Sequence, residues 1–195
     1  MSPDGRVPRL AVIVPAYRCA STLRASLAGL LASDLPRHEW ELVVIDDGSG
    51  DDTAAVAALH ADRVVTIEDG PRGPAHARNT GAAATRAPLL VFIDADVVVA
   101  PATLRQLAVH LRDGSGTDAV FGAYDTTPAD SGFVSQYRNL LHHRVHAQNA
   151  GIATTFWAGC GAVRRDAFDS VGQFDAMRYP RPQVEDIELG YRLTA

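Results

Sequence analysis

Cysteine is scarce in this 195-residue chain, and long apolar runs and a strong excess of either charge are missing. Its two cysteines, Cys19 and Cys160, lie far apart and outside any C-x-x-C pair, which argues against a disulfide framework or a zinc knuckle. We expect both to be small buried side chains. No stretch of about 18 apolar residues occurs, so the sequence predicts no membrane-spanning helix.

The N-terminus has no apolar stretch of the kind found in signal peptides. Residues 1–9 are polar and contain two prolines, so we expect a cytoplasmic protein. Residues 188–195 have the pattern of a helix that stops midway, which leaves open whether the natural chain continues. Nothing in the sequence predicts the oligomeric state.

Charge and composition exclude several classes of protein. The net charge is −5, and the arginines are scattered while acidic residues cluster after apolar segments. A nucleic-acid-binding domain normally presents a basic face, so we expect no nucleic-acid partner. With 47% apolar and 21% charged residues the composition is globular, and the length fits one domain over residues 1–195.

Short apolar segments alternate with helical patterns in the first half of the chain. Leucines recur at helical spacing after Ala20, and Val56 and Leu59 continue an Ala-rich helical segment behind a potential cap at Asp51 to Thr53. Such alternation predicts βαβ units, and therefore an α/β fold with a mainly parallel sheet and helices on both faces. The predicted strands are Leu10–Val14, Leu42–Ile45, Arg63–Ile67 and Leu89–Ile93.

The second half has a less regular pattern. A helix is predicted to begin at Pro101, because proline is favoured at the first helical position. Further along we expect a strand over residues 119–124, an amphipathic helix over 133–146, and a strand or loop over 154–163 that contains Gly159 and Gly161.

Polar residues follow three of the predicted strands, and ligands of open α/β sheets bind at the carboxyl ends of strands. Asp94 and Asp96 come directly after one strand, where residues two apart in extended backbone point the same way. Two carboxylates at one place suit a hard cation, Mg²⁺ or Mn²⁺, that takes further ligands from phosphate and water. The alternative is a solvated turn whose acids cap the next helix.

Asp46 and Asp47 end another predicted strand and begin a turn with Gly48 and Ser49. Turn and cap preferences explain most of this segment. A carboxylate at the end of a buried strand could also accept a hydrogen bond from a base N–H or a ribose hydroxyl.

Two further segments have a structural and a functional interpretation. Arg78 lies in the helix predicted after Gly73, and could neutralise a diphosphate or lie on a solvated helix face. The segment is not a P-loop, because G-x-x-x-x-G-K-[ST] is absent. Glu185 and Asp186 begin a helix, where acids are favoured by the dipole but where a general base could also stand.

Taken in order, these segments resemble glycosyltransferase family 2, a group of inverting transferases with the GT-A fold. The match spans nearly the whole chain, and the ordered set is more specific than any single motif. It implies a Rossmann-like nucleotide-binding half over about residues 8–115 and an acceptor-side half over about 116–195. The matching segments are Val12–Tyr17, Asp46–Ser49 with Asp51 and Thr53, Ala77–Gly81, Phe92–Asp96, Gly161–Phe168, Val171–Asp175 and Glu185–Arg192.

By this resemblance the chain would move a sugar from a nucleotide-diphosphate donor to a carbohydrate or lipid-linked acceptor, with UDP as the expected carrier and GDP and dTDP left open. Asp96 would hold Mg²⁺ or Mn²⁺, and Asp186 would be the general base with Glu185 beside it. Trp157 and Gly159 would form the wall around sugar and acceptor, although Trp157 could equally be a core residue. The residues implied for the nucleotide sugar are Pro15, Ala16, Tyr17, Asp46, Asp47, Arg78, Asp94 and Ala95.

The chain departs from some relatives. The Q-x-x-R-W motif of processive synthases is absent, so the sequence does not support processive synthesis, and the histidine ligand that follows the base in some GT-A enzymes is missing. Residues 136–146 carry three histidines and two arginines without zinc-site spacing. They could form an ordinary solvated helix or a basic amphipathic surface for peripheral membrane contact at the inner face.

Three rival functions differ in their sequence requirements. A nucleotidyltransferase would need a Gly-rich basic loop after the first strand, and Pro15 to Cys19 is not one. A dehydrogenase would need G-x-G-x-x-G there. A domain or fragment that binds nucleotide without turnover would share every motif named above.

Overall fold

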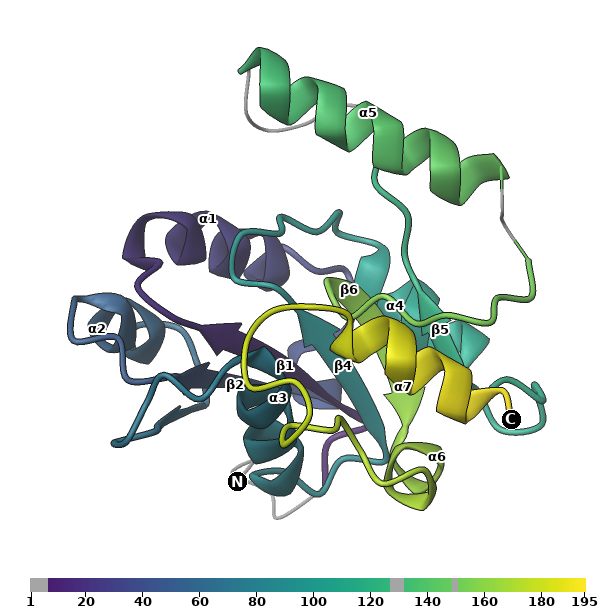
Figure 1. Cartoon of the computed structure of the whole chain (residues 1–195), viewed down its shortest axis with the longest axis horizontal. Helices are drawn as coiled ribbons and strands as arrows, with labels where there is room; N and C mark the ends of the chain where they lie inside the picture. Colours follow the sequence, from purple (N-terminus) through teal and green to yellow (C-terminus); the bar gives the residue numbers. More distant parts are fainter. Residues whose placement is uncertain (1–6, 127–131, 149–150) are drawn as a thin grey trace.

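A six-stranded sheet in the order β3-β2-β1-β4-β6-β5 forms the centre of the computed structural model, which describes residues 7–126, 132–148 and 151–195 (Figure 1). Strands β1 to β4 run parallel, whereas β6 is antiparallel to both β4 and β5. The mainly parallel sheet is therefore confirmed, while residues 1–6 lie outside the described part. The strands are β1 (Leu10–Ala16), β2 (Trp40–Asp46), β3 (Arg63–Thr66), β4 (Leu89–Ile93), β5 (Ala119–Phe121) and β6 (Cys160–Arg164).

Helices cover both faces of this sheet, as predicted. Leu10, Val12 and Val14 of β1 belong to a core with α1, α2 and α4, whereas Ile13 points to the opposite core, where α3, α6 and α7 pack. Alternate residues of a strand thus supply both cores. The helices are α1 (Ala20–Leu31), η1 (Arg37–Glu39), α2 (Thr53–Ala58), α3 (Pro74–Ala83), α4 (Thr103–His110), α5 (Phe133–Gln148), α6 (Arg165–Ser170) and α7 (Glu185–Leu193).

The second core is rich in aromatic rings that surround Phe92 of β4. Phe156, Phe168 and Phe174 lie with their ring centroids 6.5, 5.6 and 5.2 Å from that of Phe92. All four rings are buried. They join β4 to the segment before β6 and to α6, so the antiparallel part of the sheet is held to the parallel part by apolar contacts.

Three local predictions were wrong. Helix α4 begins at Thr103, because Pro101 lies in the preceding turn. Leu59 is 66% exposed just after α2 ends, so it does not continue the apolar face of that helix. Both cysteines are free but only partly buried, Cys19 directly before α1 and Cys160 at the start of β6.

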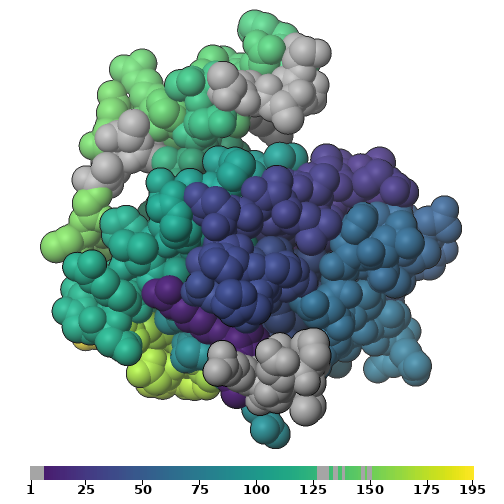
Figure 2. Space-filling model, turned by 180° about the vertical axis from the view of Figure 1, so that it is seen from behind, coloured from purple at the N-terminus to yellow at the C-terminus, as the bar shows by residue number. Residues whose placement is uncertain are grey.

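Helix α5 lies apart from the two layers that cover the sheet (Figure 1). In the opposite view, its green atoms stand above the rest of the molecule (Figure 2). Several of its apolar residues are exposed, including Phe133 at 83% and Tyr137 at 60%. Among the helices of the described segments, none combines the length and apolar character needed to cross a bilayer.

Candidate active site

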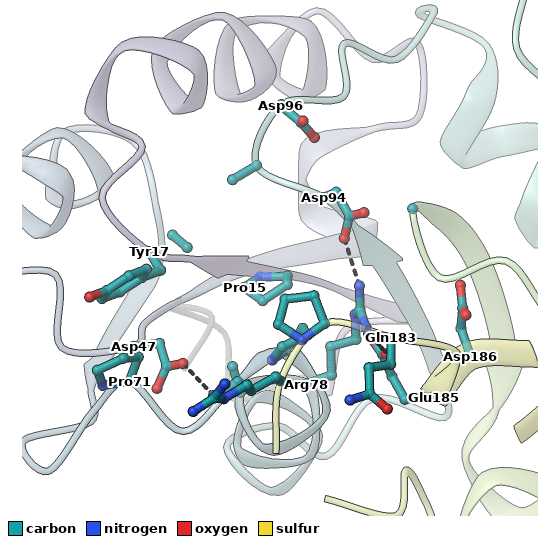
Figure 3. A pocket seen from close by; sticks show the side chains of 18 of the residues that line it. Pro15, Tyr17, Asp47, Pro71, Arg78, Asp94, Asp96, Gln183, Glu185 and Asp186 are labelled. Atoms are coloured by element: carbon teal, nitrogen blue, oxygen red, sulfur yellow. Dashed lines mark hydrogen bonds and ion pairs between the residues drawn. The ribbon is translucent and has the colours of Figure 1, made fainter. Parts of the chain in front are cut away.

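A cleft of about 920 Å³ lies at the carboxyl ends of β1, β2 and β4 (Figure 3). Parallel pairing aligns Ala16 with Asp46, so the ends of β1 and β2 meet at one edge of the sheet. Every predicted site residue except Asp46 lines the cleft: Pro15, Ala16, Tyr17, Asp47, Arg78, Asp94, Ala95, Asp96, Trp157, Gly159, Glu185 and Asp186. The structure thus brings together residues from both ends of the chain.

The end of β1 forms one wall of the cleft. Ala16 is buried, while Tyr17 is 40% exposed and presents its ring where the chain turns (Figure 3). Arg18, in the left-handed region with φ 48°, places its guanidinium 5.2 Å from the centroid of the Tyr17 ring. The Arg18 amide donates to Oγ of Ser49 at 3.0 Å, which fixes this wall to the turn after β2.

The two acids after β2 have separate tasks. Asp46 is buried beneath the cleft and accepts hydrogen bonds from the Ser49 amide, at 3.2 Å, and from the Ser49 hydroxyl. Asp47 lines the cleft, where its two carboxylate oxygens accept the backbone amides of Arg72 and Gly73 at 2.8 and 2.7 Å. Asp46 therefore supports the turn, and Asp47 holds the loop before α3.

Asp94 and Asp96 lie in a turn and not in extended backbone, which corrects the prediction that both point the same way. The Val97 amide closes this turn on the Asp94 carbonyl at 3.0 Å. Asp94 is directed toward Arg78, whereas Asp96 is exposed at the edge of the cleft (Figure 3). Ala95 between them is not turned away, because it also lines the cleft.

This turn is compatible with a hard divalent cation. Within the described ranges, no three His, Cys, Asp or Glu side chains are grouped to enclose a metal ion. Mg²⁺ and Mn²⁺ need no such cage in nucleotide enzymes, since they are often held by one or two carboxylates, phosphate oxygens and water. The exposed carboxylate of Asp96 and the half-exposed Asp94 meet that requirement.

Arg78 is buried, which excludes the alternative of an arginine on a solvated helix face. Its Nη2 donates to Asp94 at 2.7 Å and its Nη1 donates to Glu185 at 2.8 Å. The side chains of Arg78 and Glu185 are 5% and 6% exposed. Burial lowers the pKa of the guanidinium, but the two carboxylates outweigh it and raise the pKa above its ordinary value, so the residue is charged.

Asp186 lies in the first turn of α7 and faces the cleft. Its Oδ2 accepts the Ala158 amide at 3.2 Å, and its Oδ1 accepts the Ile187 amide at 2.8 Å. Burial raises the pKa of the Asp186 carboxyl, while these hydrogen bonds and the charge of Arg78 oppose the rise. A carboxylate with a raised pKa in a cleft is suited to accept a proton near neutral pH.

Trp157 and Gly159 line another part of the cleft. Trp157 is half-buried and lines the cleft, so it is not purely a core residue. The Gly159 carbonyl accepts the Asp94 amide at 3.1 Å, and a Cβ at Gly159 would lie 2.9 Å from Nε1 of Trp157. The absence of a side chain at Gly159 thus allows the Asp94 turn and Trp157 to approach each other.

Several residues of the cleft carried no signal in the sequence. Tyr124 was predicted only as the end of a strand, yet its ring stacks on His142 of α5 and lies 6.5 Å from that of Trp157. The loop Pro180 to Gln183 also lines the cleft. A Cβ at Gly73 would lie 2.5 Å from the Pro180 carbonyl oxygen, so this glycine allows the loop to cross the start of α3.

Comparison with known proteins agrees with this geometry. The family model for glycosyl transferase family 2 matches residues 11–172. The chain belongs to glycosyl transferase family 2. It is 26% identical over 177 residues to the glycosyltransferase AglE of Haloferax volcanii, which covers 86% of this chain and 56% of AglE.

Solved structures show the same fold. One is the mannosyltransferase PcManGT from Pyrobaculum calidifontis, solved with GDP-Man and Mn²⁺. The match covers 95% of this chain and 51% of the PcManGT chain, with a TM-score of 0.71 and 27% identity. Glucosyl-3-phosphoglycerate synthase from Mycobacterium tuberculosis, solved with Mn²⁺, UDP and glucosyl-3-phosphoglycerate, covers 86% of this chain and 60% of its own, with a TM-score of 0.59 and 26% identity. The GT-A fold is thereby confirmed, and the chain spans little more than half the length of these relatives.

Proposed function

We propose that this chain transfers a sugar from a nucleotide-diphosphate donor, UDP-linked, to an acceptor hydroxyl by metal-assisted single displacement. The observation that carries the proposal is the meeting of acids from three elements in one cleft: Asp47 after β2, Asp94 and Asp96 after β4, and Asp186 in α7. Family membership supports the reaction class. Several like charges in a cleft also favour the binding of a cation and a phosphate-bearing ligand together.

The donor nucleoside is assigned to the β1 side of the cleft. Pro15 and Ala16 offer an apolar surface, and the exposed ring of Tyr17 offers a face for the base. Asp47 provides carboxylate oxygens to a base N–H, with its position fixed by the loop before α3. Asp46 acts from below by holding the turn, and Asp94 and Ala95 form the floor beneath the diphosphate and sugar.

The residues at the end of β4 fit a divalent metal, Mg²⁺ or Mn²⁺. Asp96 would hold it, together with donor phosphate oxygens and water. Such a cation stabilises the negative charge that develops on the leaving nucleotide diphosphate. PcManGT and glucosyl-3-phosphoglycerate synthase were both solved with Mn²⁺, which supports this assignment.

The acceptor side is assigned to α7 and the segment before β6. Asp186 removes the acceptor proton, and the acceptor oxygen attacks the anomeric carbon from the face opposite the leaving group. A single displacement of this kind inverts the configuration, so an α-linked donor gives a β-linked product. Trp157 and Gly159 shape the space for sugar and acceptor, and Glu185 lies beside Asp186 at the start of α7.

Helix α5 provides a surface for peripheral contact with a membrane that carries a lipid-linked acceptor. Phe133, Tyr137, Leu140 and Leu141 are exposed at spacings of one helical face. The opposite face turns inward, where Asn139 donates to the Asp125 carbonyl at 2.7 Å. The helix contains arginines and histidines and no acidic residue, which favours an anionic lipid surface.

A screen of nucleotide sugars tests the proposal. Thermal shift with and without Mn²⁺ should select a UDP-sugar whose stabilisation depends on the metal. Proton NMR of the product should then show the inverted anomer. A retained anomer would overturn single displacement, and metal-dependent binding without transfer or donor hydrolysis would favour the alternative of a nucleotide-binding domain. A released sugar 1-phosphate with nucleotide exchange would favour a nucleotidyltransferase.

A further inference from the structure

Arg78 occupies a position between the two halves of the cleft. It comes from the second turn of α3, and its partners are Asp94, 16 residues later, and Glu185, 107 residues later. Asp94 belongs to the turn that carries Asp96, and Glu185 directly precedes Asp186. One guanidinium therefore connects the proposed metal-binding turn with the helix that bears the proposed base.

The donors of Arg78 are already directed at protein groups. Nη1 and Nη2 each donate to a carboxylate, and Nε is buried without a hydrogen-bond partner among the described residues. A group that is only 4% exposed and paired with two acids has little freedom to reach along a donor diphosphate. Because Asp94 and Glu185 already neutralise the positive charge of Arg78, that charge is not available to neutralise an added anion.

The Glu185 side of this network extends into the cleft loop. The second carboxylate oxygen of Glu185 accepts the Gln183 amide at 2.9 Å, which fixes the loop before α7. That loop includes Arg181, which is exposed, lines the cleft and forms no ion pair with any residue in the described part of the chain. Among the described residues that line the cleft, Arg78 and Arg181 are the two arginines, and no lysine lies beside them.

We propose that Arg78 is a positioning residue, which holds the Asp94 turn and the Asp186 helix in register, and that Arg181 supplies the positive charge for the donor diphosphate. This inference rests on the proposed function. Without Arg78, the buried Glu185 and the adjacent Asp94 would face each other with no cation between them, and like charges at this separation repel. Asp47 is held by the amides of Arg72 and Gly73, and the chain after Tyr17 is held by Ser49, so these residues of the proposed nucleoside side should keep their positions.

Calorimetry with two probes separates the roles of the two arginines. UDP carries the diphosphate and uridine does not, so the ratio of their affinities in Mn²⁺ measures the diphosphate contacts. Measured again without added metal, where the contribution of Asp96 is absent, this ratio should stay within about threefold of wild type for Arg78→Met, whereas for Arg181→Met it should fall about tenfold or more. A tenfold fall for Arg78→Met, or an unchanged ratio for Arg181→Met, would overturn the assignment.

Turnover supplies the second readout. Arg78→Met should lower kcat about 100-fold with little change in the KM for donor, and Arg78→Lys should restore part of kcat because it returns one positive charge. If Arg78→Met does not fold, Glu185→Gln removes one ion pair and keeps the side-chain shape, and it should lower kcat while UDP binding is kept. A kcat within about threefold of wild type in Arg78→Met, or in Glu185→Gln where it replaces that variant, would contradict a positioning role.

The two proposals fail in different ways. If the wild-type protein binds UDP but transfers no sugar, the proposed function is wrong, and the ratio of UDP to uridine affinity still decides which arginine contacts the diphosphate. If wild type transfers sugar and Arg78→Met loses the diphosphate contribution, the proposed function stands and the inference about Arg78 is wrong.

Discussion

The backbone amide of Ala158 lies 3.2 Å from Oδ2 of Asp186 and donates a hydrogen bond to it. This contact joins the wall of the cleft before β6 to the first turn of α7, across 28 residues of chain. It fixes one oxygen of the carboxylate that we propose as the base. The orientation of that carboxylate therefore depends on how closely α7 packs against residues 155 and 156.

The pH dependence of transfer should follow Asp186. Burial raises the pKa of its carboxyl above 3.8, and a base works only when ionised, so kcat should rise with pH through a midpoint above that value. Arg78 lowers this pKa, so Arg78→Met should move the midpoint to higher pH. Measurement of kcat from about pH 4 to pH 9 checks both expectations. A profile without an acidic limb would exclude Asp186 as the titrating base.

The effect of Mn²⁺ on UDP binding should depend on Asp96. We expect Asp96→Asn to weaken UDP binding in the presence of Mn²⁺ by about tenfold or more, and to leave metal-free binding unchanged, because it removes a charged metal ligand. Asp113→Asn is the matched control, since Asp113 is fully exposed and does not belong to the described residues that line the cleft. Calorimetry with and without Mn²⁺ makes the comparison. Equal losses in both conditions would show that Asp96 contacts the nucleotide and not a metal.

Gly190 should be required for the position of α7. A Cβ there would lie 2.2 Å from the Phe156 amide nitrogen, so Gly190→Ala must displace backbone. We expect the free energy of unfolding to fall by about 1–3 kcal/mol, and kcat to fall with it. Gly29→Ala is the milder comparison and should lose less stability, because its Cβ would lie 3.0 Å from a Val98 side-chain carbon and 3.3 Å from the Val99 backbone, while alanine favours helix by up to about 1 kcal/mol. Denaturant unfolding that shows no loss for Gly190→Ala would contradict this packing.

Membrane contact should depend on the outward face of α5. We expect wild-type protein to sediment with vesicles of anionic phospholipid and not with neutral vesicles, and Leu140→Asp to weaken binding roughly tenfold, since burial of one leucine contributes about 1.5–3 kcal/mol. Leu59→Asp carries the same change on another exposed leucine and should bind normally. Equal binding by wild type and Leu140→Asp would exclude α5 as the contact surface.

Much of the fold could be predicted from the sequence because local patterns determine it. The four apolar runs became β1 to β4 with small shifts at their ends, since buried parallel strands need continuous apolar residues. The direction of β6 could not be predicted. Gly161 in β6 leaves room for the Phe156 ring, but the direction of β6 is set by its pairing with β4, which lies far earlier in the chain.

The candidate site, like the fold, could be predicted from the sequence only in part. Residues at strand ends were predicted to converge, because the carboxyl ends of parallel strands share one edge. The partners of Arg78 could not be predicted, since no local pattern distinguishes an arginine that faces solvent from one that meets Glu185 107 residues away. The role of Asp46 could likewise not be distinguished from that of Asp47, because only the structure shows that Asp46 accepts a hydrogen bond from Ser49 within the turn.

The most direct test of the account is the replacement Asp186→Asn, which keeps the size of the side chain and removes its ability to accept a proton. We predict that transfer is abolished while donor affinity stays within about threefold of wild type, because the carboxylate acts on the acceptor. Glu188→Gln, on the same helix but paired with Arg192, should retain turnover. Substantial transfer by Asp186→Asn would contradict the assignment of Asp186 as the general base, and with it the mechanism proposed for this cleft.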